Sequence, residues 1–152
     1  MKRSIKQIAL TVAVMMTLGI GSSFAAPIGK NGQENINNSF HRDFREAELL
    51  STNAGKEYTK LTFKTHGVIL SAFYSDNGEL LAVTRNISSN QLPLRLLMEL
   101  KNSYANYWIT DLFEINSNGS SSYYITLENA DTKLTLRSGD AAWDTYNKSI
   151  KE

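Results

Sequence analysis

The chain contains no cysteine and only two prolines among its 152 residues. The absence of cysteine excludes a disulfide framework, a zinc–thiolate site and a cysteine nucleophile. Histidine is also scarce, because His41 and His66 are the only two. Few side chains are therefore available for acid–base catalysis near neutral pH. A chain of this length can bury an apolar core without covalent cross-links.

Neither sign of charge dominates the sequence. The chain has 16 basic and 15 acidic residues, which gives a formal net charge of +1 at pH 7. A balance this close to neutral provides no chain-wide attraction to nucleic acid or to anionic lipid. We therefore expect no nucleic-acid partner.

Long apolar runs are absent except at the N-terminus. Three basic residues precede an apolar run from Ile8 to Ile20, and the small residues of Gly21–Ala26 follow. This three-part pattern is typical of a cleavable secretory signal peptide, with cleavage after Ala25. As a helix the run would measure about 20 Å, too short for a hydrocarbon core of roughly 30 Å. The sequence therefore predicts a signal peptide over residues 1–25, a periplasmic or secreted protein, and no membrane insertion after cleavage.

The segment after the cleavage site lacks apolar periodicity. Residues 26–37 are polar and rich in asparagine and glycine, which predicts a flexible leader. The domain proper is then expected over residues 38–152. Its first helix runs from about Asn38 to Ala47, because apolar side chains at i, i+4 and i+7 fall on one helical face. Those side chains are Phe40, Phe44 and Ala47.

Short β segments follow this helix, separated by turns that contain glycine or asparagine. They cover roughly residues 48–52, 57–65, 68–75 and 80–86. A second helix opens at Ser88–Pro93 and runs to about Ala105, with a buried stripe of Leu96, Leu97, Leu100 and Tyr104. Four more β segments are expected at roughly residues 107–116, 122–128, 132–137 and 141–146.

The two halves share a pattern in the same order. Leu61-Thr-Phe63 matches Ile125-Thr-Leu127, and the Phe-x3-Phe spacing of the first helix matches a Leu-x3-Tyr spacing in the second. This order predicts an internal repeat over about residues 38–87 and 91–150. One such unit cannot bury its apolar sheet face alone. We therefore predict an α+β domain, a tandem αββββ repeat whose antiparallel sheet carries both helices on one face.

These motifs, together with the signal peptide, resemble the PepSY-like secreted proteins of Bacteroidota, which are grouped with the β-lactamase-inhibitor-protein fold. The resemblance is carried by the Phe-x3-Phe helix, the strand Tyr58–Phe63, the hairpin Ala72–Gly78, the opening Gln91-Leu92-Pro93 and the strand Ser122–Leu127. Two positions depart from the pattern. Leu49 and Leu50 stand where a tryptophan often follows the first helix, and Ser138-Gly139-Asp140 replaces the usual Asp-x-x-Gly. The resemblance implies an exported module that binds proteins or peptides, including as a restraint on a hydrolase, without catalytic residues.

The sequence contains only fragments of catalytic and metal-binding motifs. His41-Arg42-Asp43 matches a kinase catalytic-loop tripeptide, but the Gly-rich loop and the other kinase motifs are missing. His66 precedes a turn glycine, which favours a hairpin position over a general base. The turn at Asp76–Glu79 carries only the first part of a calcium loop. We therefore predict no catalytic residue, no metal site and no cofactor.

The better functional clue is the sheet face that the helices leave uncovered. If Leu61, Phe63, Tyr74, Ile125 and Leu127 face the helices, strand alternation sends a set of aromatic, aliphatic and cationic side chains to the opposite face. Aromatic rings and arginine are common anchors of protein interfaces. The predicted binding residues are Tyr58, Lys60, Ile69, Phe73, Tyr124, Lys133 and Arg137.

The sequence therefore favours an exported, non-enzymatic protein- or peptide-binding module that acts in the envelope or outside the cell. Two alternatives remain open at this point. One is a small periplasmic hydrolase that uses His41 or His66 with a neighbouring carboxylate. The other is a structural component of the envelope. A solvated sheet face that carries β-forming residues for propensity alone would also fit the open-face pattern. The oligomeric state does not follow from the sequence.

Overall fold

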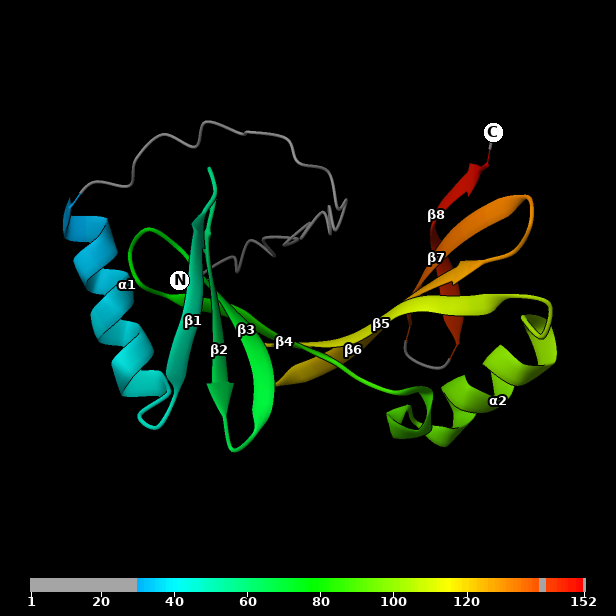
Figure 1. Cartoon of the computed structure of the whole chain (residues 1–152), viewed down its shortest axis with the longest axis horizontal. Coiled ribbons are helices and arrows are strands. Elements are labelled where there is room, and N and C mark those ends of the chain that lie inside the picture. Colours follow the sequence, from blue (N-terminus) through cyan, green and yellow to red (C-terminus); the bar gives the residue numbers. More distant parts are fainter. Residues whose placement is uncertain (1–29, 140–141, 152) are drawn as a thin grey trace, which may run out of the picture.

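A computed structural model of the protein describes residues 30–139 and 142–151. The predicted signal peptide and residues 26–29 of the expected leader lie outside the described residues. The described elements run in two successions of one helix and four strands, with a short 3₁₀ turn before the second helix (Figure 1). They are α1 (Lys30–Asp43), β1 (Glu48–Ala54), β2 (Thr59–Thr65), β3 (Val68–Tyr74), β4 (Leu80–Asn86), η1 (Ser89–Gln91), α2 (Leu94–Ser103), β5 (Trp108–Ser117), β6 (Ser120–Glu128), β7 (Thr132–Ser138) and β8 (Trp143–Ile150). In this part of the chain, no helix combines the length and apolar character that a membrane span requires.

All the strands belong to one eight-stranded antiparallel sheet in which each strand pairs with its neighbours in sequence, from β1 to β8. Tight turns connect several of the pairs. His66 and Gly67 have φ angles of 48° and 81°, and Asn118 and Gly119 have 52° and 78°. Two consecutive residues with positive φ form the type I′ geometry that matches the twist of a hairpin. The observed strands confirm the predicted ones to within a few residues.

The first helix differs from the prediction, because α1 begins at Lys30 rather than at about Asn38. Most of the segment expected to be a flexible leader is therefore helical. Its sequence has weak helix propensity, but Ile36 is completely buried against the sheet, as is Phe40. Helices in proteins are stabilised mainly by packing of an apolar face, and one buried isoleucine extends that face by a turn.

The second helix is preceded by a separate 3₁₀ turn, so α2 itself covers only Leu94–Ser103. The Ser88 backbone N–H donates to the Gln91 side-chain carbonyl over 2.9 Å, which closes this turn. The predicted stripe is confirmed. Leu96 and Leu100 are buried, and the remaining two side chains of the stripe pack against the same cluster.

Both helices pack on the same face of the sheet. Cross-strand pairing connects Ala72 of β3 to Val83 of β4 and Val83 to Asn116 of β5. Residues two apart on a strand share a face, so Asn116 lies on the side of Leu112, which packs under α2. Ala72 packs under α1. The molecule is elongated, with α1 near one end and α2 near the other (Figure 1).

A hydrogen bond from a buried tyrosine ties the end of α1 to the sheet. The Tyr74 side chain is fully buried and its hydroxyl donates to Asp43 Oδ2 over 3.1 Å. Burial, reinforced by the nearby carboxylate, raises the pKa of the Tyr74 phenol far above its ordinary value near 10. Asp43 also pairs with Arg42 at 2.9 Å. The helix terminus is therefore fixed by polar contacts as well as by packing.

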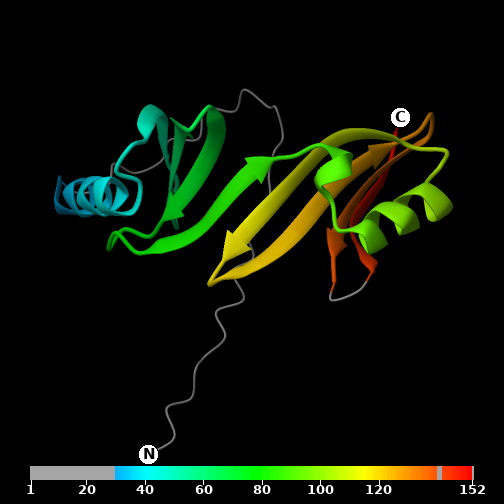
Figure 2. The ribbon, with the colours of Figure 1, turned by 90° about the horizontal axis from the view of Figure 1, so that it is seen from below.

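One apolar cluster lies under each helix, and a third lies on the opposite face of the sheet, around the junction of β4 and β5. It consists of Phe73, Ala82, Phe113, Ile115 and Tyr124, all at most 8% exposed. The prediction that Phe73 and Tyr124 are exposed is wrong. The sheet is strongly twisted (Figure 2), so side chains from neighbouring strands cover one another on this face. The sequence suggested one core, under the helices, whereas the sheet has apolar packing on both faces.

Candidate functional site

The candidate site is the open face, defined as the face of the sheet opposite α1 and α2. Lys60 of β2 lies directly across from Phe73 of β3, and Tyr124 of β6 lies directly across from Arg137 of β7. The same pairing puts Ile69 and Lys133 on this face. Tyr58 precedes β2, and its ring contacts that of Phe73 with centroids 5.3 Å apart. Strand alternation therefore brought the predicted residues to one face, although it did not predict their burial.

Two cations lie over two rings of the buried cluster. Lys60 Nζ is 5.9 Å from the Phe73 ring centroid, and the Arg137 guanidinium carbon is 5.8 Å from that of Tyr124. Both distances fit cation–π attraction. Neither cation forms an ion pair with a carboxylate of the described residues. Burial raises the pKa of the Tyr124 phenol, and the charge of Arg137 opposes that shift.

Next to Lys60 the open face is hollowed. The pairing of β3 with β4 begins only at Ser71 and Thr84, so the strands separate beyond these residues. The resulting hollow has a volume of about 410 Å³, and Lys60 and Ile69 both line it. Ile69 is 57% exposed, which is costly for a branched aliphatic side chain in water. An exposed aliphatic side chain beside a cation that has no carboxylate partner among the described residues suits recognition of another molecule.

At the far end of the sheet the open face carries Trp108, which is 52% exposed. Lys151 Nζ lies 5.0 Å from its ring centroid and 2.6 Å from Glu128. Lys133 also approaches Glu128, at 3.5 Å. The hydrogen bond from Lys151 is the main reason that the pKa of Glu128 lies below its ordinary value. Lys133 therefore takes part in an ion-pair network, unlike Lys60.

Sequence reasoning missed several open-face residues. Phe113 stacks on Tyr124 with a centroid distance of 5.3 Å and an interplanar angle of 1°, and Tyr146 meets the same ring edge-on at 5.6 Å. Trp108 was missed as well. Alternation alone could have grouped Phe113 with Ile115, because they are two residues apart on one strand. Assigning that group to the open face needs the register between β4 and β5, which the sequence did not reveal.

The two histidines lie in solvent-exposed positions. His41 is exposed on α1 and its ring meets that of Phe40. His66 Nδ1 lies 3.0 Å from the Thr65 hydroxyl, and its Nε2 lies 3.5 Å from Glu46 Oε2, but both side chains of the ion pair are 80% exposed. His66 and Glu46 are therefore exposed to solvent. A catalytic nucleophile and its base are instead held in a fixed geometry and shielded from water. Among the described residues, no cluster of side chains could hold a metal ion.

Comparison with known proteins identifies the fold. No family model matches the chain, and no curated protein matches it either. Solved structures from Bacteroides do. A BLIP-like (β-lactamase-inhibitor-protein-like) protein from Bacteroides fragilis matches with a TM-score of 0.64 and 16% identity, over 77% of this chain and 84% of that one. A DUF2874 family protein from Bacteroides uniformis matches with a TM-score of 0.67 and 8% identity, over 76% and 87%.

A protein from Bacteroides eggerthii that is predicted to be periplasmic also matches, with a TM-score of 0.67 and 7% identity over 77% of this chain and 87% of that one. The chain therefore has a BLIP-like α+β fold. Identities this low show the fold alone. Function has to be argued from the residues of the open face.

Proposed function

We propose that the protein is an exported, non-enzymatic module of the PepSY-like type, built as a tandem αββββ repeat, which binds a protein or peptide on its open face. The observation that carries this proposal is the pair of cations, Lys60 and Arg137, which lie over aromatic rings without a carboxylate partner among the described residues. Burial of a cation-bearing surface by a complementary partner strengthens such contacts. The N-terminal pattern and the similarity to a protein predicted to be periplasmic support action in the periplasm or outside the cell.

The geometry changes which residues would act as anchors. Phe73 and Tyr124 are buried, and Lys60 and Arg137 lie over their rings. The side chains that a partner can reach include Lys60, Ile69, Lys133 and Arg137, and at the far end Trp108. Exposed aliphatic and aromatic groups beside cations match the composition of interface centres. A partner with carboxylates next to an apolar side chain would complement this pattern, and restraint of a hydrolase is one form that such binding would take.

The test is capture of partners from an envelope extract by the purified protein, followed by measurement of the affinity for each captured protein. The open-face variant combines Lys60→Ser, Ile69→Ser and Lys133→Ser. We expect it to fold and to lose affinity by about 10-fold or more, because interface anchors contribute roughly 1–2 kcal/mol each.

A matched control removes the same kinds of side chain from the helix-bearing side. It combines Met98→Ser, Lys101→Ser and Lys148→Ser, and Met98 is 54% exposed, close to the 57% of Ile69. The control should bind like the wild type. If the wild type and both variants bind equally and have the same circular dichroism, the open face is not the binding site. A partner lost only by the control variant would transfer the site to the helix-bearing side.

A further inference from the structure

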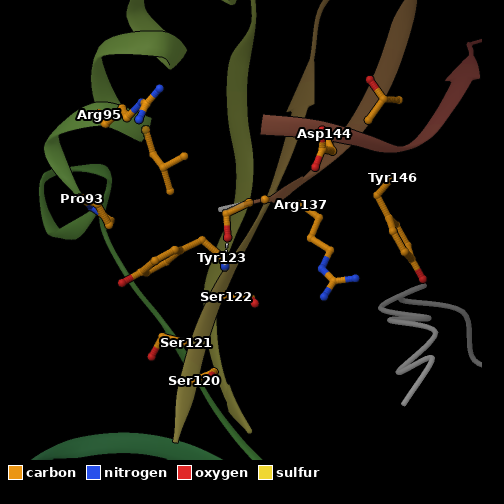
Figure 3. Close-up of a pocket in the computed structure, with 13 residues that line it drawn as sticks. Pro93, Arg95, Ser120, Ser121, Ser122, Tyr123, Arg137, Asp144 and Tyr146 are labelled. Carbon is orange, nitrogen blue, oxygen red and sulfur yellow. Dashed lines mark hydrogen bonds between the residues drawn. The ribbon is translucent and has the colours of Figure 1, made fainter. Parts of the chain in front are cut away.

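The sheet contains a notch between β6 and β7, distinct from its outer edges. The ladder between these strands begins at Tyr124 and Arg137, and Tyr123 reaches the last residue of β7 through one hydrogen bond, so the first three residues of β6, Ser120–Ser122, lie beyond the end of β7. Beside them lies a hollow of about 780 Å³. Its walls are the first turn of α2 on one side and the end of β7 with the start of β8 on the other (Figure 3).

The backbone of β6 faces this notch with groups that can form hydrogen bonds. The Tyr123 N–H donates to Ser138 Oγ over 2.9 Å, which shows that it points toward the β7 side. Backbone groups two residues apart on a strand point to the same side, so the N–H and C=O of Ser121 also face the notch. Ser121 lies beyond Ser138, the last residue of β7, and has no ladder partner there among the described residues. A strand edge is thus left open inside the sheet, with room beside it.

Charged side chains flank this strand edge on both faces of the sheet. Arg95 comes from α2, on the helix-bearing side, and Arg137 comes from the open face (Figure 3). Neither forms an ion pair with a described carboxylate. Asp144 also lines the hollow, but its Oδ2 lies so close to Gly139 that a β-carbon there would be only 2.6 Å away. Its carboxylate is therefore turned toward the β7–β8 connection.

We propose that this notch binds an extended acidic peptide segment of a partner protein, which adds to Ser120–Ser122 as a short antiparallel or parallel strand. Main-chain hydrogen bonds to a free strand edge supply affinity in this mode, and side-chain positions supply specificity. Side chains of a strand alternate between its faces. One carboxylate would reach Arg95 on the helix-bearing side, and a second, at an odd separation in the peptide, would reach Arg137 on the open face. Arg137 is shared with the open face, whereas Ser121 and Arg95 belong to this notch alone.

The alternation gives a sharp test with synthetic peptides of identical composition. Three capped six-residue peptides of Thr, Val and two Glu residues carry the glutamates at i and i+1, at i and i+2, or at i and i+3. Titration into ¹⁵N-labelled protein should move the Ser121 and Tyr123 amide resonances, and the hydrogen exchange of the Ser121 amide should slow. At least one peptide with odd spacing should bind roughly twofold to fivefold more tightly than the i, i+2 peptide.

Two variants distinguish the contribution of main-chain hydrogen bonds to peptide binding from the contribution of the arginine charge. Ser121→Pro removes the N–H that faces the notch while leaving the pairing with β5, since proline is tolerated where a strand edge has no partner. It should abolish the shifts, and Arg95→Gln should weaken binding roughly twofold to fivefold and remove the preference for odd spacing. No shifts with millimolar peptide, shifts confined to the outer strands β1 or β8, or unchanged binding by both variants would overturn the proposal. Capture of the envelope partner is measured separately, so failure here leaves the open-face proposal standing.

Discussion

Mutation of Phe113 tests whether the apolar cluster on the open face stabilises the fold. Its side chain is 3% exposed and stacks face to face on Tyr124. Phe113→Ala removes a buried ring and leaves a cavity, which costs about 3–5 kcal/mol in other cores. The total stability of domains is about 5–15 kcal/mol, so this loss is a large fraction of it. With a urea slope of about 1.5 kcal/mol/M, the unfolding midpoint should fall by roughly 2–3 M.

The control is Tyr146→Ala, which removes a ring from the same neighbourhood that is 42% exposed. It should cost about 1 kcal/mol. Urea unfolding followed by circular dichroism measures both variants. A cost below about 1 kcal/mol for Phe113→Ala would contradict burial of this side chain, because it would mean that the ring lies on a solvated surface. The combined change Tyr58→Ser, Phe73→Ser and Tyr124→Ser, at three of the predicted binding residues, should prevent cooperative folding.

Two further predictions concern single contacts, and a third concerns the N-terminal sequence pattern. Tyr74→Phe removes the hydrogen bond to Asp43 and should cost about 1–2 kcal/mol. Because the folded pKa of Tyr74 is raised, wild-type stability should be complete below about pH 10 and fall above it, and less steeply in this variant. Gly78→Ala should cost more than about 2 kcal/mol, because its β-carbon would lie 2.8 Å from a carbonyl oxygen of α1, whereas Gly119→Ala, with the same φ of 78° and open space, should cost about 1 kcal/mol. N-terminal sequencing of exported protein should begin at Ala26, and an intact N-terminus in a membrane pellet would contradict the predicted cleavage.

Local sequence signals predicted most of the elements for clear physical reasons. The strand Thr59–Thr65 alternates so regularly that Leu61 and Phe63 had to share a face, and both are buried under α1. Turn residues such as His66-Gly67 marked the hairpins because few other pairs accept two positive φ angles. Such signals depend only on neighbours in the sequence.

The start of α1 and the burial of the open face depend instead on tertiary packing. A single apolar residue, Ile36, extends the helix into a polar segment, and nothing in its immediate sequence predicts that it meets the sheet. Alternation placed Phe73 and Tyr124 on the correct face, but their burial follows from the twist of the sheet and from contacts with Phe113 and Tyr146 on other strands. The sequence therefore predicted which residues lie on the open face, but it did not predict which of them are exposed to a partner.

The absence of cysteine permits a direct test of binding at the open face. A single cysteine introduced as Ile69→Cys or as Met98→Cys can carry a photoreactive cross-linker at a unique position, and the two sites have nearly equal exposure. Each labelled protein is irradiated with the partner captured from the envelope extract, and the cross-linked product is quantified. We expect cross-linking from position 69 and little from position 98. Equal yields, or cross-linking from position 98 alone, would contradict binding at the open face.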